Sequence, residues 1–177
     1  MKKLLLIFAL SLVALGVRAQ ETRREERMEL KHERAERREE RQKEYARYLD
    51  SLILSRDYEF VPQTFQMQPA GMLRNIYNPF YYIYVYPSYI QIHVPYIKGF
   101  TPPYYIALLN FDSFYPNGYT AVQGEHGWTI SFSASGMDGN TYTFDFFVNY
   151  VGGETNLNIS TPVYNTVPYS GYLRGYN

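Results

Sequence analysis

The chain of 177 residues contains no cysteine. Disulfide bonds, thiol nucleophiles and thiolate metal sites are therefore excluded, as is the lipid-accepting cysteine of a bacterial lipoprotein. The 17 Lys and Arg residues balance the 17 Asp and Glu residues, so no basic field is present to attract nucleic acid. The protein must fold by packing a core, and no nucleic-acid partner is expected.

Charge is scarce after residue 60 and dense before it. About two residues in three are charged from Glu21 to Asp50. The part from Val61 to Asn177 contains all 10 Pro and most of the 20 Tyr. Its only charged residues are Arg74, Lys98, Asp112, Glu125, Asp138, Asp145, Glu154 and Arg174. An aromatic segment with few charges can bury a core, whereas the charged segment cannot.

Residues 1–19 have the pattern of a signal peptide. Lys2 and Lys3 precede an apolar run from Leu4 to Val17, and Val17-Arg18-Ala19 is a small-x-small cleavage site. The run is shorter than the roughly 20 residues that cross a bilayer. We expect cleavage before Gln20, export to the periplasm or the extracellular space, and no transmembrane segment afterwards. A retained anchor is the alternative.

Residues 20–56 are expected to form a charged helix. Glu21 to Tyr48 contains neither Gly nor Pro and is built from strong helix formers. At 100° per residue, the charged residues form two stripes roughly 130° apart. The basic stripe is Arg23, Arg27, Lys31, Arg34, Arg38 and Arg41, and the acidic stripe is Glu26, Glu29, Glu33, Glu36, Glu40 and Glu44.

The charged helix lacks the apolar seam of a coiled coil. A solvated spacer is the main interpretation. A coiled coil-like alternative is weak self-association, in which two helices pair antiparallel with the acidic stripe of one against the basic stripe of the other. Tyr45, Tyr48, Leu49 and Leu52 share one face near the helix end. We expect this amphipathic end to dock on the domain that follows.

Residues 57–177 are expected to form a Tyr-rich β domain. Turn signals every 8–12 residues indicate a mainly β fold, an antiparallel sandwich or a partly open barrel of about 7–9 strands. Gln68–Asn78 and Pro95–Pro103 are expected loops, and Pro62 should lie at an edge or a bulge. The expected strands are Tyr58–Met67, Phe80–Tyr86, Tyr89–Val94, Tyr104–Phe111, Tyr119–Gln123, Trp128–Ala134, Tyr142–Val148, Thr155–Ser160 and Tyr169–Leu173.

One hairpin has a predictable register. The segments Trp128–Ala134 and Tyr142–Val148 alternate apolar and polar residues around Met137-Asp138-Gly139. Their apolar faces coincide only if the loop has an odd number of residues. A loop of three residues fits, with Gly139 in the left-handed conformation that closes a type I turn with a bulge. The expected pairs are Phe132 with Phe144, Ala134 with Tyr142, and Ile130 with Phe146.

The sequence predicts no catalytic, metal-ligating or cofactor-binding residue, and no cofactor. His93 lies on the expected strand face opposite Ile90, Ile92 and Val94, where a packed or surface histidine is the simpler interpretation. Glu125 and His126 are adjacent in a turn, but a metal site needs three or four converging groups. No Ser-His-Asp arrangement and no phosphate-binding glycine loop is visible.

The tyrosines offer the candidate contact surface. Tyr82, Tyr84 and Tyr86 share a strand face with Phe80, and Tyr89 opens the next strand. Tyrosine gives rigid, amphipathic contact area for sugars or peptides. The alternative is that these rings rim a small core. Which face of Phe80–Tyr86 is exposed, and whether the sheet closes into a barrel, stay open.

These observations favour a non-enzymatic binding or structural module of the cell envelope, with an envelope protein or a glycan as its partner. The competing hypothesis is a small-ligand carrier or a hydrolase with a site built from dispersed polar residues. A deep pocket holding His93, Asp112 or Glu125 would favour that competitor.

Several short stretches, in order, resemble a known family. They are LILSRDYEFV from Leu52, VPYIKG from Val94, WTISF from Trp128, GNTYTF from Gly139 and VPYSGYL from Val167. Together with the charged helix they resemble the exported Bacteroidetes family catalogued as domain of unknown function 4251. The resemblance implies a periplasmic or outer-surface location and a β-rich fold, with no established activity. This chain is richer in tyrosine, and it lacks the glycines expected between Pro103 and Asn117.

Overall fold

The computed structural model describes residues 2–68, 71–99, 104–114 and 116–175, with side chains for residue 24 and from residue 26 onward. The side chains of the expected signal peptide, residues 1–19, lie outside this part. The chain divides into two compact units, residues 1–43 and residues 44–177. Helix α1 (Lys2–Ser55) belongs to both units. Within the described residues, no helix has the length and apolar character that a membrane crossing requires.

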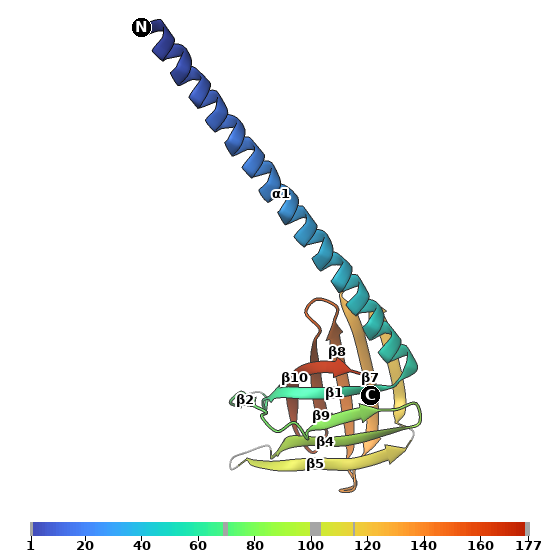
Figure 1. Cartoon of the computed structure of the whole chain (residues 1–177). Coiled ribbons are helices and arrows are strands. Elements are labelled where there is room, and N and C mark those ends of the chain that lie inside the picture. The colour runs from blue at the N-terminus through green and yellow to red at the C-terminus, as the bar shows by residue number, and fades with distance from the viewer. Residues whose placement is uncertain (1, 69–70, 100–103, 115, 176–177) are drawn as a thin grey trace. The chain divides into compact units, whose positions relative to one another are not determined.

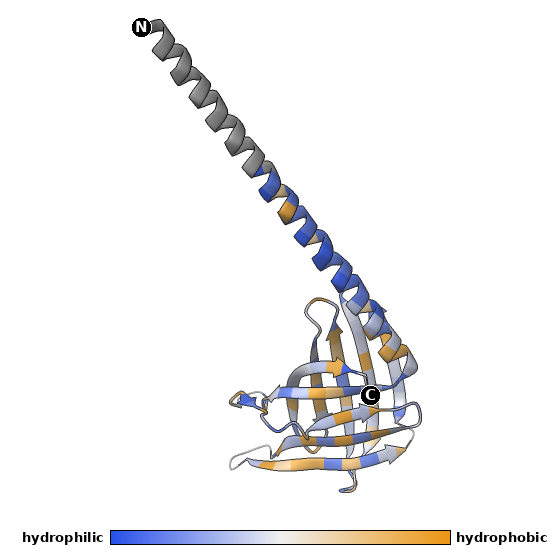
Figure 2. Ribbon diagram, in the orientation of Figure 1, coloured by the Kyte–Doolittle hydropathy of each residue, from blue (hydrophilic) through white to orange (hydrophobic). Residues whose placement is uncertain are grey.

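The first unit is a helix whose described side chains are mostly charged (Figure 2). Ion pairs join residues four apart, at 3.2 Å between Glu33 and Arg37 and at 2.7 Å between Glu39 and Lys43. Such exposed pairs stabilise the helix only slightly. Met28 is 61% exposed, so this part of the helix presents no apolar stripe.

The second unit contains one antiparallel sheet of ten strands (Figure 1). The strands are β1 (Tyr58–Phe65), β2 (Arg74–Asn75), β3 (Tyr82–Val85), β4 (Tyr89–Lys98), β5 (Tyr105–Phe114), β6 (Asn117–Gly124), β7 (Gly127–Ser135), β8 (Thr141–Asn149), β9 (Glu154–Thr161) and β10 (Tyr164–Arg174). Their order is β5-β4-β3-β1-β10-β9-β8-β7-β6, with β2 beside β1. The mainly β prediction is confirmed.

The sheet curls into a half-barrel rather than forming a sandwich. Strands β5 and β6 are at opposite edges of the sheet, yet they follow one another directly in the chain, from Phe114 to Asn117. So short a link can join the two edges only if the sheet curves until they approach each other. The partly open barrel is therefore the correct alternative.

Two features of the strands differ from the sequence prediction. Strand β2 lies within the expected loop Gln68–Asn78, which raises the strand count to ten. Strand β4 continues through Pro95 into the expected loop Pro95–Pro103. Proline is tolerated there because β3 pairs with β4 only as far as His93, so Pro95 has a neighbouring strand on one side.

Pro62 lies at a bulge and not at a sheet edge. Strand β1 lies between β3 and β10, and its register to β10 shifts between Pro62 and Thr64. Strand β3 pairs with Tyr58, Glu59 and Phe60, and β2 pairs with Thr64 and Phe65. Pro62 therefore interrupts neither of these two short ladders.

The predicted hairpin register between β7 and β8 is confirmed. Phe132 pairs with Phe144, Ala134 with Tyr142, and Ile130 with Phe146. The Gly136 amide donates to the Asn140 carbonyl at 2.8 Å, and the Gly139 amide donates to the Gly136 carbonyl at 3.1 Å. Gly139 has a φ of 76°, in the left-handed region that the three-residue loop requires.

The core fills the concave side of the sheet with aromatic side chains. The rings of Phe60 and Phe146 meet edge to face at 5.5 Å between centroids, and those of Phe132 and Phe144 stack at 5.1 Å. Four tyrosines are also buried: Tyr58, Tyr96, Tyr142 and Tyr169. Each finds a polar partner for its hydroxyl group, as Tyr169 does with the Pro95 carbonyl at 2.5 Å. The tyrosines are thus divided between the core and the outer face.

The end of helix α1 contributes to this core. Leu49 and Ile53 are 0% and 1% exposed, whereas Leu52 is only partly buried. Spacing by four residues places Leu49 and Ile53 on one face. Asp50 anchors the same helix turn, because its Oδ1 accepts hydrogen bonds from Trp128 Nε1 and the Tyr150 hydroxyl, both at 2.7 Å.

Candidate functional site

The outer face of β3 and β4 carries the tyrosines that the sequence singled out. Strand alternation points Ile83 and Val85 into the core, where both are fully buried. Tyr82 and Tyr84 consequently point outward and are half-buried. Tyr86 and Tyr89 flank the turn between the two strands and are also half-buried. We call Tyr82, Tyr84, Tyr86 and Tyr89 the tyrosine surface.

The four rings of the tyrosine surface form a continuous column. Ring centroids lie 4.3 Å apart for Tyr82 and Tyr84, and 5.9 Å apart for Tyr84 and Tyr86. Tyr86 and Tyr89 stack at 4.4 Å with 17° between their planes. Because each ring packs against the next, the side chains lose little further freedom when a ligand covers them.

Polar groups flank this column on β4 and β5. His93 stacks on Tyr82 at 5.6 Å between ring centroids, and its Nδ1 is 2.7 Å from Asn110 Oδ1. Gln91 lies between Tyr84 and Asp112 in the sheet register. The rings are therefore bordered by an imidazole, an amide and a carboxylate, all on the outer face.

An ion pair links the tyrosine surface to strand β10. Glu59 lies between Tyr84 on β3 and Arg174 on β10, and it is only 3% exposed. Arg174 holds both carboxylate oxygens of Glu59, with Nη2 at 3.0 Å from Oε1 and Nε bonded to Oε2. The hydrogen bond to Glu59 raises the pKa of the Arg174 guanidinium. The guanidinium compensates the charge of the buried Glu59 carboxylate, so Arg174 is already paired within the protein.

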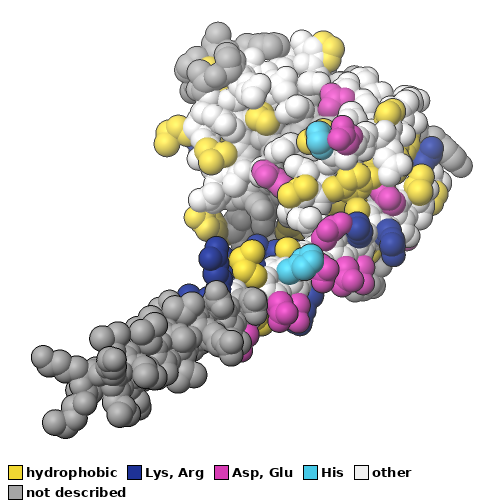
Figure 3. All heavy atoms as spheres, turned by 90° about the horizontal axis from the view of Figure 1, so that it is seen from above, with side chains coloured by type: hydrophobic (Ala, Val, Ile, Leu, Met, Phe, Trp, Pro, Cys, Tyr) yellow, Lys and Arg dark blue, Asp and Glu magenta, His cyan; other side chains and the backbone are white. Residues whose placement is uncertain are grey.

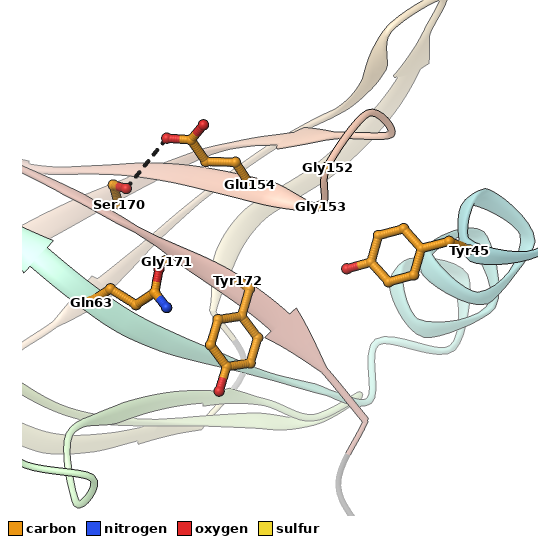
Figure 4. A pocket seen from close by; sticks show the side chains of 8 residues that line it. All are labelled: Tyr45, Gln63, Gly152, Gly153, Glu154, Ser170, Gly171 and Tyr172. Atoms are coloured by element: carbon orange, nitrogen blue, oxygen red, sulfur yellow. Dashed lines mark hydrogen bonds between the residues drawn. The ribbon is translucent and has the colours of Figure 1, made fainter. Parts of the chain in front are cut away.

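A groove of about 560 Å³ opens beside this ion pair, on the outer side of β1, β9 and β10 (Figure 4). We call it the β9–β10 groove. Its lining residues are Tyr45, Gln63, Gly152, Gly153, Glu154, Ser170, Gly171 and Tyr172. Glu154 and Ser170 lie side by side on neighbouring strands, and the Ser170 hydroxyl donates to Glu154 Oε1 at 3.4 Å. The groove thus combines a few polar side chains with apolar surface that includes two aromatic rings.

Tyr45 reaches the groove from helix α1 because residue 153 is a glycine. A Cβ at Gly153 would lie 2.4 Å from the Tyr45 hydroxyl oxygen. Gly153 also has a φ of 69°, in the left-handed region that residues other than glycine adopt less readily. The Gly152-Gly153 turn therefore leaves the space into which the Tyr45 ring fits.

A smaller, more apolar pocket of about 210 Å³ lies elsewhere on the domain. It is lined by Met67, Gly71, Met72, Arg74, Ile97, Tyr104 and Ile106. On the face of the β domain seen in Figure 3, hydrophobic side chains lie scattered among a few charged ones.

The polar residues proposed for a dispersed catalytic site do not converge in either pocket. His93 and Asp112 lie on the outer face of β4 and β5, whereas Glu125 and His126 are exposed in the turn between β6 and β7. Among the side chains that the structure describes, no three His, Asp or Glu residues come close enough to hold a metal ion.

The sequence analysis did not identify the β9–β10 groove. Its polar side chains Gln63, Glu154 and Ser170 come from three strands that are far apart in the chain. Only the pairing of β10 with both β1 and β9 brings them together. The available signals were the Gly-Gly turn and the outward positions of Glu154, Ser170 and Tyr172.

Comparison with known proteins identifies a family. The model of a domain of unknown function, DUF4251, matches residues 40–173. A crystal structure of a DUF4251 family protein from Bacteroides eggerthii DSM 20697 is 14% identical and superposes with a TM-score of 0.60. The match covers 74% of this chain and 87% of that chain. No curated protein matches. Since the family model spans the end of the helix and all but the last residue of the sheet, the chain belongs to the DUF4251 family.

Proposed function

We propose that the protein is an exported, non-enzymatic binding module of the cell envelope that holds a glycan against its tyrosine surface. One observation carries this proposal, the column of four packed tyrosine rings on the outer face. Tyrosine combines a flat apolar ring with a hydroxyl group. A pyranose likewise combines an apolar C–H face with hydroxyl groups, so the two surfaces are complementary.

The neighbours of the column support a glycan more than a protein partner. Gln91, His93 and Asp112 provide both hydrogen-bond donors and acceptors beside the rings. The column lies on the sheet surface and not in a deep pocket, which suits an extended chain of sugars. The envelope location rests on the signal-peptide pattern of residues 1–19.

Pull-down with insoluble polysaccharides tests the binding function. The purified protein should sediment with at least one of cellulose, chitin, xylan, mannan and peptidoglycan sacculi. A Tyr82→Ala, Tyr84→Ala, Tyr89→Ala variant should bind that polysaccharide at least about tenfold more weakly, since each aromatic contact contributes about 0.5–1.5 kcal/mol.

Phe147→Ala is the matched control, because Phe147 is an exposed ring on the outer side of β8, away from the tyrosine surface. Circular dichroism verifies that both variants fold. Unchanged binding by the triple variant, or binding to an envelope protein and to none of the polysaccharides, would contradict the proposal.

The export proposal has its own measurement. The protein secreted by its native host should begin at Gln20, because Val17-Arg18-Ala19 directs signal cleavage there. Mass spectrometry of the exported form reads this directly, and retention of Met1 would contradict it.

A small-ligand carrier is the second candidate function, and the β9–β10 groove is the observation that favours it. Its volume of about 560 Å³ lies within the roughly 300–1,000 Å³ usual for small-molecule sites.

A further inference from the structure

We infer that the β9–β10 groove is a saccharide subsite that binds one or two neutral sugar units and selects among glycans. This inference deepens the proposed function and rests on it. The tyrosine surface would supply contact along a glycan chain, and the groove would supply recognition.

The polar lining of the groove fits a polyol. Gln63 offers an amide that donates and accepts, and the Glu154 carboxylate accepts. The Ser170 hydroxyl donates to Glu154, and its oxygen can still accept from a ligand. Neighbouring hydroxyl groups of one sugar present donors and acceptors at short intervals. A simple ammonium ion would use the carboxylate but would leave the amide hydrogens of Gln63 without a partner in the ligand.

Two tyrosine rings complete the lining. Tyr172 comes from β10 and Tyr45 from the helix end (Figure 4). The Tyr45 ring is held by Tyr48 at 6.1 Å between centroids and by the Gly153 backbone. Rigid rings beside hydrogen-bonding groups give a pyranose an apolar contact for its C–H face.

The charge of the groove excludes anionic ligands. Glu154 is the only charged residue in the lining. Arg174, on the same strand as Ser170 and Tyr172, already holds Glu59 with two hydrogen bonds. A uronate, a sulfate or a phosphate would meet the Glu154 carboxylate without a cation from the lining to compensate it.

The groove and the tyrosine surface are close enough for one glycan. Tyr172 pairs with Glu154 on one side and with Val61 on the other. Two residues along β1, Glu59 lies beside Tyr84. A chain of sugars can therefore run along β3 and cross β1 while its end occupies the groove.

Glycine amide resonances locate the ligand. The chain has 12 Gly, so protein labelled with ¹⁵N-glycine gives a simple spectrum. Titration with neutral tri- and tetrasaccharides of glucose, mannose, xylose and galactose should shift Gly152, Gly153 and Gly171, which line the groove. Gly118 in β6 and Gly139 in the turn between β7 and β8 are not part of the groove lining and should not shift.

Charged oligosaccharides are the comparison ligands. Galacturonate oligomers should leave the groove resonances unchanged, and glucosamine oligomers should shift them only at higher concentration than the best neutral sugar. No shift with any neutral sugar, or a stronger response to either charged oligomer, overturns the inference.

Variants separate the groove from the tyrosine surface. Gln63→Ala and Glu154→Gln should each weaken binding of the short neutral sugar about tenfold, and Asn156→Ala is a control on the outer side of β9. The variant that lacks Tyr82 and Tyr84 should keep the groove shifts. If it also keeps polysaccharide binding, the proposed function fails and the groove stands. If that variant loses polysaccharide binding while the groove resonances of the wild type do not shift with any neutral sugar, the proposed function stands and the groove inference fails.

Discussion

Replacement of Leu49 by alanine tests whether the end of helix α1 is part of the folded domain. Leu49 is 0% exposed and packs in the core of the sheet. Burial of a whole leucine side chain contributes about 1.5–3 kcal/mol by transfer from water alone. The cavity left by truncation adds to this, and Leu→Ala changes in cores cost about 2.7–5 kcal/mol.

Leu54→Ala is the matched control, because the same helix places Leu54 at 70% exposure. Alanine has the highest helix propensity, so neither change weakens the helix itself. The control should therefore stay within about 0.5 kcal/mol of the wild type. The difference between the two variants measures packing and not helix formation.

Urea unfolding followed by the fluorescence of the single tryptophan, Trp128, is a suitable assay, because Trp128 donates to Asp50 on the same helix turn. Leu49→Ala should lower the unfolding free energy by about 3 kcal/mol or more with an unchanged m-value. Equal midpoints for Leu49→Ala and Leu54→Ala would refute the reasoning, since the helix end would then not be packed against the sheet.

Three further predictions concern single residues. Asp50→Ala should destabilise the fold by about 2–4 kcal/mol in the same urea assay, because it leaves the Trp128 and Tyr150 donors without their acceptor; wild-type stability would contradict this. Gly153→Ala should also destabilise it by about 1–3 kcal/mol, through the left-handed φ and the contact with Tyr45, and Gly118→Ala, which meets no neighbouring atom, should cost less. Burial would raise the pKa of Asp138, but hydrogen bonds from Tyr142, Asn140 and Lys98 together lower it to about 2. A lowered pKa stabilises the fold above the unfolded pKa of about 4, so this contribution should disappear as the pH falls from 4 to 2. Asp138→Asn should reduce the fall of the urea unfolding midpoint between about pH 4 and pH 2. An unchanged fall would contradict the lowered pKa of Asp138.

Local alternation predicted the parts of the fold that depend on neighbouring residues. The β7–β8 register followed from two apolar faces that had to coincide, and the position of Gly139 followed from the loop length. The outward position of Tyr82 and Tyr84 was one of two faces left open. The burial of Ile83 and Val85 shows that the tyrosine face is the outer one. The sequence of one strand alone cannot show which of its two faces is buried.

Features that depend on distant pairing could not be predicted. Ile53 was missed because its burial depends on where the sheet meets the helix end. The continuation of β4 through Pro95 depends on where β3 stops, and proline is ordinarily a strand breaker. The β9–β10 groove depends on β10 lying between β1 and β9, an arrangement that no local sequence pattern encodes.

The central pairing of β1 with β10 has a consequence for how the chain folds. The strands β1, β3, β4 and β5 pair with near neighbours in the sequence, and so do β6 to β10. The two sets are joined within the sheet by the β1–β10 ladder, where the Glu59–Arg174 bond spans 115 residues. Local hairpins can form early, but closure of such a long loop is slow. The common core should therefore assemble only after β10 has been synthesised, and loss of the last strand should leave two separate half-sheets.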